Sequence, residues 1–341
     1  MQHEIQIALP LLNRKGSLTD SGWARDALPI YRRADVRGSR LRIKEWDHYL
    51  VSNSRFALSL TISNYSYMKY ASASLIDFVK RSETTKSTMP VISRATLEMS
   101  ESSLSGNTSF SGPGFGIFFN NDSGRRTLIC HVDKFGGEGP LSAKILLPDE
   151  PAESIVTATP FEKPNQFYYN RKILGMSASG EVIYGGKTWE FDAGDSAATL
   201  NWGRGIWPRR SVRYWSAGYG ELDGAKFGFN LGYGYSKHPT TENAIFYNGV
   251  IHKLEKAVFY IPVREGARDY LAPWRITSSD GRIEMDFEPQ MDRSQRRDTG
   301  LFHGERHQVF GNFSGTATLD DGTVLEIRDF FGFVDSSENK W

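Results

Sequence analysis

The sequence predicts an all-β fold made of short antiparallel strands joined by tight turns. The chain has 341 residues, of which 33 are glycine, and aromatic residues make up 13% of it. Glycine suits tight turns, and aromatic residues are enriched in strands. In several segments every second residue is apolar, whereas no segment of comparable length shows the helical period. The aromatic content also excludes a wholly disordered chain.

The first half begins with an irregular stretch and continues with strands. Residues 1–45 show no clear period and contain glycine and proline breakers, so we expect an irregular N-terminal arm. In residues 56–62 apolar residues alternate with small or polar ones, which predicts a half-buried strand, and residues 65–80 are its expected partner. The Ser- and Thr-rich residues 81–114 lack this period and predict a mobile loop or a lid.

The second half repeats the same pattern. Residues 283–287 and 313–319 alternate between apolar and polar residues, as strands do. An Asn-Gly or Asp-Gly pair between such runs is a strong hairpin signal. Four such pairs occur, namely Asp223-Gly224, Asn248-Gly249, Asp280-Gly281 and Asp321-Gly322. These signals predict an antiparallel sandwich or barrel in each half, with residues 186–211 as a linker between domains 1–195 and 196–341.

Charge and cysteine content narrow the partners and the compartment. Lys and Arg number 41 and Asp and Glu number 40, so the net charge of +1 predicts no nucleic acid or anionic membrane as partner. The single cysteine, Cys130, forms no disulfide within the chain and is expected to be a small buried residue. The N-terminus lacks signal-peptide features, and no segment has the ~20 apolar residues of a spanning helix. We therefore expect a cytoplasmic monomer or homodimer.

One predicted strand has an unusual face. If residues 213–223 form one strand without a bulge, one face carries Arg213, Trp215, Ala217, Tyr219, Glu221 and Asp223. Burying unpaired charge is costly, so such residues inside a barrel should pair with one another or line a wet cavity. In the alternative interpretation, Glu221 and Asp223 are solvated near the turn.

The next strands supply further candidates. Residues 227–235 alternate bulky residues with Gly or Asn, so a ligand, or simply a bulky neighbouring strand, could approach closely. Glu242, Arg213 and His252 would combine a carboxylate, a fixed cation and a titratable base if they met. The candidate catalytic residues are therefore Glu242, Asp223 and Arg213. The candidate ligand-binding residues are Trp207, Trp215, Tyr219, Asn230, Asn243 and His252.

Signals for metals and cofactors are weak. His303 and His307 share a face only if their segment is helical, and the sequence contains no H-E-x-x-H and no Cys pair. We therefore expect a solvated loop there and no metal. Residues 112–116 are glycine-rich but open no helix, so we expect no phosphate cradle and no cofactor.

Five segments of the chain form a joint pattern, namely Gly16-Ser17-Leu18, Gly22-Trp23-Ala24-Arg25, Phe229-Asn230-Leu231-Gly232, Thr241-Glu242-Asn243 and the tail from Gly315 to Trp341. Together they resemble a known family, the bacterial domain of unknown function 2804, over nearly the whole chain. The layout is distantly similar to two-domain lipocalin-like proteins such as the carotenoid 1,2-hydratases. This resemblance implies two tandem lipocalin-like (calycin) barrels with a ligand cavity. Where those hydratases have a His-x-Trp element, this chain has Arg213-Tyr214-Trp215, so the histidine is missing.

These observations lead to a first hypothesis and two alternatives. The first is a cofactor-independent hydratase, dehydratase or isomerase that holds a mainly apolar small molecule. Glu242 or Asp223 would donate the proton, Arg213 would set its pKa or hold an anionic group, and Trp215 and Tyr219 would line the wall. The first alternative is a non-catalytic carrier of a lipid or polyene. The second is a carbohydrate-active enzyme in which Asp223 and Glu242 act as a pair.

Overall fold

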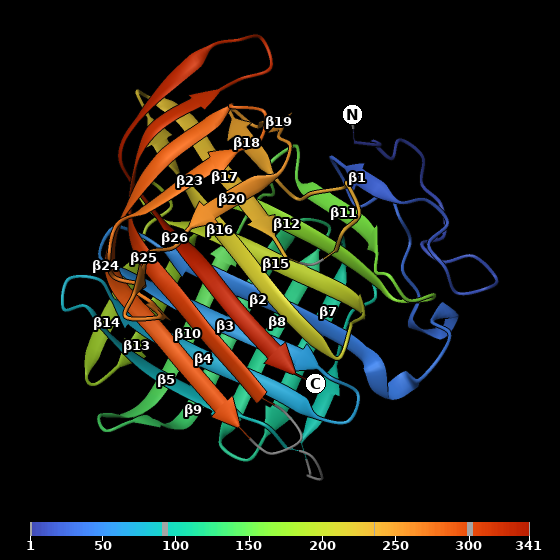
Figure 1. Cartoon of the computed structure of the whole chain (residues 1–341). Coiled ribbons are helices and arrows are strands. Elements are labelled where there is room, and N and C mark those ends of the chain that lie inside the picture. The colour runs from blue at the N-terminus through green and yellow to red at the C-terminus, as the bar shows by residue number, and fades with distance from the viewer. Residues whose placement is uncertain (1, 91–94, 235, 299–302, 341) are drawn as a thin grey trace. The chain divides into compact units, whose positions relative to one another are not determined.

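The computed structural model describes residues 2–90, 95–234, 236–298 and 303–340. The chain divides into two compact units, one formed by Ile5–Trp207 and the other by Pro208–Trp341 together with Met1–Glu4. The described residues form antiparallel strands and the short 3-10 helices η1 (Arg33–Asp35) and η2 (Arg40–Arg42), with no α-helix among them (Figure 1). The predicted all-β class is confirmed. None of these residues forms a helix long and apolar enough to cross a bilayer.

In the described residues, the N-terminal unit contains two antiparallel sheets. The first has the strand order β1-β11-β12-β15-β2-β3-β4-β5 and the second β14-β13-β10-β9-β8-β7-β6. The strands of the first sheet are β1 (Gly22–Ala24), β2 (Ile43–Ser52), β3 (Phe56–Asn64), β4 (Lys69–Asp77), β5 (Ser82–Thr88), β11 (Ile155–Pro160), β12 (Phe167–Ser177) and β15 (Ala197–Ile206). Those of the second are β6 (Thr96–Glu98), β7 (Gly106–Gly112), β8 (Phe115–Asp122), β9 (Arg125–Gly136), β10 (Gly139–Leu147), β13 (Ser179–Tyr184) and β14 (Lys187–Phe191).

The core of this unit lies between its sheets. The ring of Tyr49 from β2 packs edge-on against Phe119 from β8, with centroids 4.7 Å apart. Strand β9 alternates buried and exposed residues, and Cys130 lies on its buried side, where burial raises the pKa of the thiol to about 12. The irregular segment before β2 is seen in dark blue in Figure 1 and matches the expected N-terminal arm.

The interior of this unit also holds charged side chains, which form ion pairs and hydrogen bonds with other protein groups. Arg204, which is fully buried, places Nη1 2.8 Å from Asp47 Oδ1. The other carboxylate oxygen of Asp47 accepts a hydrogen bond of 2.7 Å from Thr108 Oγ1 on the opposite sheet. Arg126 donates to the hydroxyl of Tyr49 at 2.9 Å. These contacts tie the sheets together from within.

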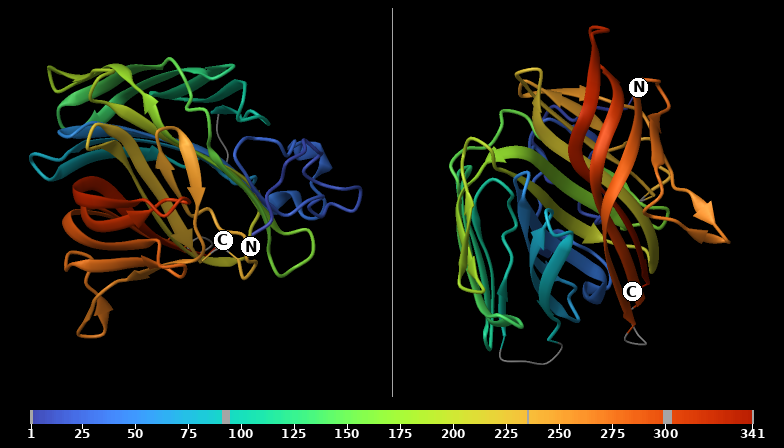
Figure 2. Two further views of the ribbon diagram at one scale, coloured as in Figure 1. Left: turned by 90° about the horizontal axis from the view of Figure 1, so that it is seen from above. Right: turned by 90° about the vertical axis from the view of Figure 1, so that its left-hand side faces the viewer.

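The C-terminal unit is built on one curled antiparallel sheet of order β19-β18-β17-β16-β26-β25-β24-β23-β20. Its strands are β16 (Arg210–Leu222), β17 (Ala225–Tyr233), β18 (Ala244–Tyr247), β19 (Val250–Lys253), β20 (Ala257–Tyr260), β23 (Trp274–Ser278), β24 (Ile283–Asp298), β25 (His303–Thr318) and β26 (Val324–Lys340), and the separate hairpin consists of β21 (Val263–Arg264) and β22 (Ala267–Arg268). Figure 2 shows how strongly the long strands β24, β25 and β26 twist. The sheet curls until Tyr233 of β17 and Phe259 of β20 are in ring contact, with centroids 5.3 Å apart.

The four predicted turns all join consecutive strands. At the β16–β17 turn, for example, Asp223 and Gly224 have φ angles of 50° and 79°. Positive φ at both central residues is the type I′ geometry that suits a two-residue hairpin, and Asp and Gly tolerate it best. The predicted strands around residues 283–287 and 313–319 are present as β24 and β25.

Two predictions about the organisation of the chain are wrong. Residues 81–114 do not form one long loop, because β5, β6 and β7 lie there; residues 91–94 fall outside the described part. Residues 186–211 are not a linker, because they contain β14 and β15, and β15 pairs with both β12 and β2 in the first sheet. Consequently the N-terminal unit extends to Trp207, beyond the expected boundary at residue 195.

The sheet of the C-terminal unit has an apolar face and a mixed face. Residues such as Tyr214, Phe229 and Leu231 belong to the buried apolar cluster of this unit. Because β16 runs without a register shift from Tyr214 to Leu222, Arg213 and Trp215 lie on the opposite, mixed face. Tyr214 and every second residue after it in β16 therefore lie on the apolar face.

Candidate functional site

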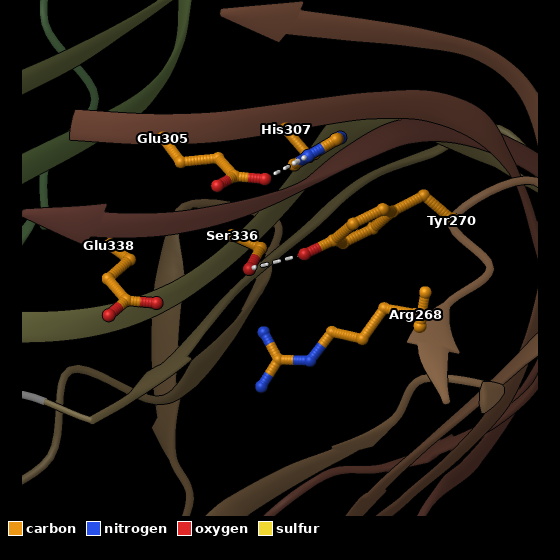
Figure 3. Close-up of a pocket in the computed structure, with 7 residues that line it drawn as sticks. Arg268, Tyr270, Glu305, His307, Ser336 and Glu338 are labelled. Carbon is orange, nitrogen blue, oxygen red and sulfur yellow. Dashed lines mark hydrogen bonds and ion pairs between the residues drawn. The ribbon is translucent and has the colours of Figure 1, made fainter. Parts of the chain in front are cut away.

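A cavity of about 340 Å³ lies on the apolar-cluster side of the C-terminal sheet (Figure 3). Its volume is within the range of small-molecule sites. It is lined by Ala267, Arg268, Tyr270, Glu305, His307, Ser336 and Glu338. These residues come from hairpin strand β22, the loop after it, β25 and β26. The lining is polar except for Ala267.

Strand register explains why the polar residues of the cavity lie side by side. His307 of β25 is paired with Ser336 of β26, which in turn is paired with Tyr214 of β16. Residues paired in this way point to the same face of a sheet. One step of the pleat further along, Glu305 is paired with Glu338 in the same manner. Exposure rises along this direction, from the buried Ser336 to the exposed Glu338.

The His307 ring is held on both nitrogens and on one face. Nδ1 lies 2.8 Å from Asp292 Oδ2, Nε2 lies 3.4 Å from Glu305 Oε1, and the ring stacks on Tyr270 with centroids 3.8 Å apart. Burial raises the pKa of Asp292, while the contact with His307 works in the opposite direction. A histidine oriented by a carboxylate is the usual arrangement for a general acid or base.

Hydrogen-bond donors of the lining lie next to His307. The hydroxyls of Tyr270 and Ser336 are 3.4 Å apart, and the guanidinium carbon of Arg268 lies 5.3 Å from the ring centroid of Tyr214. Burial works against the charge of Arg268, but the phenol oxygens of Tyr270 and Tyr214 outweigh it and raise the pKa of Arg268. Burial also raises the pKa of Tyr214 despite Arg268, so the Tyr214 phenol keeps its proton.

The hairpin β21–β22 positions Arg268. Its turn residues Glu265 and Gly266 have φ angles of 53° and 82°, as a type I′ turn requires. The base of the hairpin is closed by a hydrogen bond of 2.8 Å from Asp269 N to the carbonyl oxygen of Pro262. Arg268 therefore enters the cavity from an exposed, separately paired hairpin.

Three of the predicted site residues lie together, on the mixed face of the sheet. The guanidinium carbon of Arg213 is 5.2 Å from the ring centroid of Trp215. Gly232 is the register partner of Trp215, and a Cβ at this position would come within 2.5 Å of Glu242 Oε1. The carboxylate of Glu242 therefore occupies the space that the glycine leaves. This cluster and the cavity are on opposite faces of the same sheet.

Asn230 and Asn243 use their amides in bonds within the protein. Asn230 accepts from Trp215 Nε1 at 2.8 Å and donates to the carbonyl oxygen of Glu242 at 2.7 Å. Asn243 accepts from Gly232 N at 2.6 Å and donates to the carbonyl oxygen of Glu255 at 2.7 Å. Both side chains hold the segment around residue 242 against β17.

A half-buried lysine that was not predicted, Lys253, lies near Glu242. Nζ of Lys253 donates to Thr241 Oγ1 at 2.9 Å and to two backbone carbonyls, those of Asn243 and Leu254. Burial lowers the pKa of Lys253 to about 7, and Glu255, Asp280 and Glu242 oppose this shift. Three acceptors match the three protons of the ammonium group, which favours a structural role for this lysine.

The remaining predicted residues lie elsewhere. Asp223 is exposed at the β16–β17 turn, eight residues and hence roughly 26 Å along the strand from Trp215, which lies near Glu242. His252 is paired with Ile245 of the apolar cluster, so it faces away from Glu242, and its Nδ1 lies 3.2 Å from Asp320 Oδ2. Arg213, Glu242 and His252 therefore do not meet.

Tyr219 and Trp207 complete the predicted set. Tyr219 is half-buried on the mixed face, where its ring covers Gly228, and burial raises the pKa of its phenol. Trp207 belongs to the N-terminal unit, in which its ring contacts Trp46 and Tyr168 at centroid distances of 5.3 and 5.0 Å. Trp207 therefore lies in a different unit from the other candidates.

His307, Asp292 and Tyr270 were not among the predicted catalytic or ligand-binding residues. The expected solvated loop around His303 and His307 is wrong, because β25 runs unbroken from His303. The missed signal was the alternation itself: extended backwards from Phe313, it places His307 on the same face. Among the described residues, no group of three or more His, Cys, Asp or Glu side chains is arranged to hold a metal ion.

The comparison with known families bears on the whole chain. The model of the family "Domain of unknown function (DUF2804)" matches residues 2–341. This chain belongs to the DUF2804 family. No curated protein matches this DUF2804 chain.

Solved structures of two other proteins share the fold of this DUF2804 chain. Kievitone hydratase from Nectria haematococca matches with a TM-score of 0.51 and 12% identity, over 96% of this chain and 98% of that one. A putative AttH from Nitrosomonas europaea matches with a TM-score of 0.51 and 13% identity, over 86% of this chain and 92% of that one. At such identities these matches establish the shared fold alone.

Proposed function

We propose that this DUF2804 protein is a cofactor-independent hydratase, dehydratase or isomerase that acts on a small molecule in the His307 cavity. The observation on which this proposal depends is a histidine fixed by Asp292 at 2.8 Å in the wall of a cavity of about 340 Å³. A purely structural histidine has no need of a cavity. The fold shared with a protein titled kievitone hydratase supports the same reaction class.

His307 transfers the proton in this proposal. Asp292 orients its ring through Nδ1, which leaves Nε2 directed to the side of Glu305. Tyr270 holds the ring flat by stacking on it. Nε2 takes a proton from water or from carbon and returns it to the other reacting atom, and Glu305 stabilises the imidazolium formed in between.

The lining refines the expected ligand. Six of the seven lining residues are polar, so a ligand with at least one oxygen-bearing group suits this cavity better than a wholly apolar one. A carrier of lipid or polyene would not require the His307–Asp292 contact. A carbohydrate-active pair of Asp223 and Glu242 needs two carboxylates within ~5 to ~9.5 Å, and Asp223 lies too far away.

Glu242 is the second candidate for the proton donor. Its side chain is buried, and a carboxyl group can act as a general acid. Arg213 and Trp215 lie on the same face nearby, as the sequence-based hypothesis requires. Substitution of Glu242 and of His307 separates the two sites.

The experiment incubates the protein with a low-molecular-weight metabolite extract in D₂O and follows masses that gain water, lose water or exchange hydrogen. We expect His307→Gln to abolish these changes and His303→Gln, four residues along the same strand, to preserve them. Glu242→Gln should preserve them as well. Turnover that survives in His307→Gln but is lost in Glu242→Gln would move the reaction to the mixed face of the sheet. If the wild-type protein binds a compound from the extract and changes no mass, the result supports the carrier alternative and contradicts the proposed reaction.

A further inference from the structure

We infer that the cavity binds the carbonyl oxygen of an α,β-unsaturated or β-hydroxy carbonyl compound through Arg268, Tyr270 and Ser336, next to the base His307. The inference rests on the proposed function and names the substrate class of the same site. It follows from two adjoining parts of the lining, which we call the donor side and the base side.

The donor side consists of groups that can all give a hydrogen bond to one oxygen. Arg268 contributes a guanidinium, and Tyr270 and Ser336 contribute hydroxyls that are 3.4 Å apart. A hydroxyl pair at this distance is at most a weak hydrogen bond, so either hydroxyl can turn to a ligand at little cost. Figure 3 shows the Tyr270 hydroxyl and Ser336 meeting above the guanidinium of Arg268.

Tyr214 packs against both Ser336 and Arg268 of the donor side. It is the register partner of Ser336, and its ring lies under the guanidinium of Arg268 at 5.3 Å. A cation over an aromatic face is held electrostatically. This contact fixes Arg268 although its hairpin is exposed. A fixed guanidinium can stabilise a negative oxygen at one defined position in the cavity.

The base side consists of acceptors. His307 lies between Asp292 and Glu305, and these carboxylates favour a positive charge on the ring once it has taken a proton. Glu338, the remaining charged group of the lining, is exposed at the mouth, where solvent and salt screen it. A matching substrate develops negative charge on one atom, which the donor side binds. It exchanges a proton with His307 at another atom.

Hydration of a conjugated carbonyl compound meets this requirement. The oxygen of water bonds to the β carbon as His307 takes a water proton, and the π electrons move to the carbonyl oxygen to give an enolate. Arg268, Tyr270 and Ser336 stabilise the enolate oxygen. The proton then passes from His307 to the α carbon and the carbonyl re-forms, so that one molecule of water has been added. The reverse sequence dehydrates a β-hydroxy carbonyl compound.

The test of the donor side uses 4-nitrophenol, whose phenolate has a delocalised negative oxygen like that of an enolate and absorbs visible light. We expect the wild-type protein to bind the probe as phenolate and to raise its ionised-to-neutral ratio by about tenfold. Arg268→Met and Tyr270→Phe should each remove this increase. Arg264→Met changes a charge on the same exposed hairpin outside the lining and should leave the increase unchanged.

The outcomes separate this inference from the proposed function. A probe that binds in the neutral form, binds equally in the three variants or fails to bind at millimolar concentration overturns the inference, even if His307-dependent turnover is observed. An ionised probe without any turnover of the metabolite extract supports the inference and refutes the proposed function.

A second measurement tests the carbonyl group directly. The metabolite extract is treated with borohydride, which reduces aldehydes and ketones but leaves carboxylates and amides, and quenched before the protein is added. We expect the aldehydes and ketones that the untreated extract supplies as substrates to be lost. Substrates that survive this treatment, contain no carbonyl group and are still hydrated would overturn the inference.

Discussion

The interiors of the two units contain charged residues in contrasting surroundings. In the N-terminal unit, Arg204 is fully buried and lies 2.8 Å from Asp47, which is itself bonded to Thr108 of the facing sheet. In the C-terminal unit, His307, Arg268 and Glu305 line a cavity of about 340 Å³. A charge enclosed by protein partners is costly to leave unpaired, whereas a charge with room beside it can meet a ligand. We therefore assign a structural role to the buried charges of the N-terminal unit and a role in ligand binding and catalysis to the charges that line the cavity.

The largest expected effect comes from breaking the enclosed pair. Asp47→Ala leaves Arg204 buried without its closest carboxylate and removes the bond to Thr108. We expect a loss of about 3–5 kcal/mol in the free energy of unfolding, measured by urea denaturation. Asp149→Ala, at an exposed position of the same unit, should change it by less than about 0.5 kcal/mol. A loss below about 1 kcal/mol for Asp47→Ala would show that the pair is not structural.

A smaller loss of stability is expected at Gly232, a backbone position of the C-terminal sheet beside Glu242. In Gly232→Ala the new Cβ would come within 2.5 Å of Glu242 Oε1 and 3.0 Å of the Tyr214 carbonyl oxygen. Overpacking of this kind costs about 1–3 kcal/mol, which thermal unfolding would detect. Gly116→Ala is the matched control, because no atom lies within 4 Å of its Cβ position. Equal stability of both variants would place the Glu242 carboxylate away from Gly232.

The smallest expected effect is the pH dependence of stability at Asp292. Burial raises the pKa of this carboxyl, so the folded protein binds its proton more tightly than the unfolded chain does. The stability contributed in this way is present at low pH and is lost as the pH rises through the raised pKa. Asp292→Asn removes the ionisation, so it should gain stability relative to wild type, on the order of 1 kcal/mol, between about pH 4 and neutral pH. A difference that stays constant over this range would contradict the shift.

Local signals in the sequence predicted much of the fold. Strands with one apolar face and the four Asp-Gly or Asn-Gly turns were recognised because each depends on neighbouring residues only. Strand β5 was missed because it is an edge strand that is polar on both faces, so it shows no alternation. Strand β15 was taken as part of a linker because its glycines and polar residues hide its central place in the sheet.

The site was harder to predict than the fold, for a physical reason. Both faces of β16 carry aromatic residues, Tyr214 on one and Trp215 on the other, so the strand alone does not reveal which face meets the core. Pairing with β26 and β25 decides it, and that pairing brings Ser336 and His307 beside Tyr214 from more than 90 residues away in the chain. The clustering of Arg213, Trp215 and Glu242 was predictable; the cavity on the opposite face was not.

The most direct measurement of the central claim is turnover by His307→Gln beside Glu242→Gln and His303→Gln, on the same metabolite extract in D₂O. We expect only His307→Gln to be inactive, so that its substrates neither gain nor lose water nor exchange hydrogen. Wild-type activity in His307→Gln would contradict it, because the cavity would then take no part in the reaction.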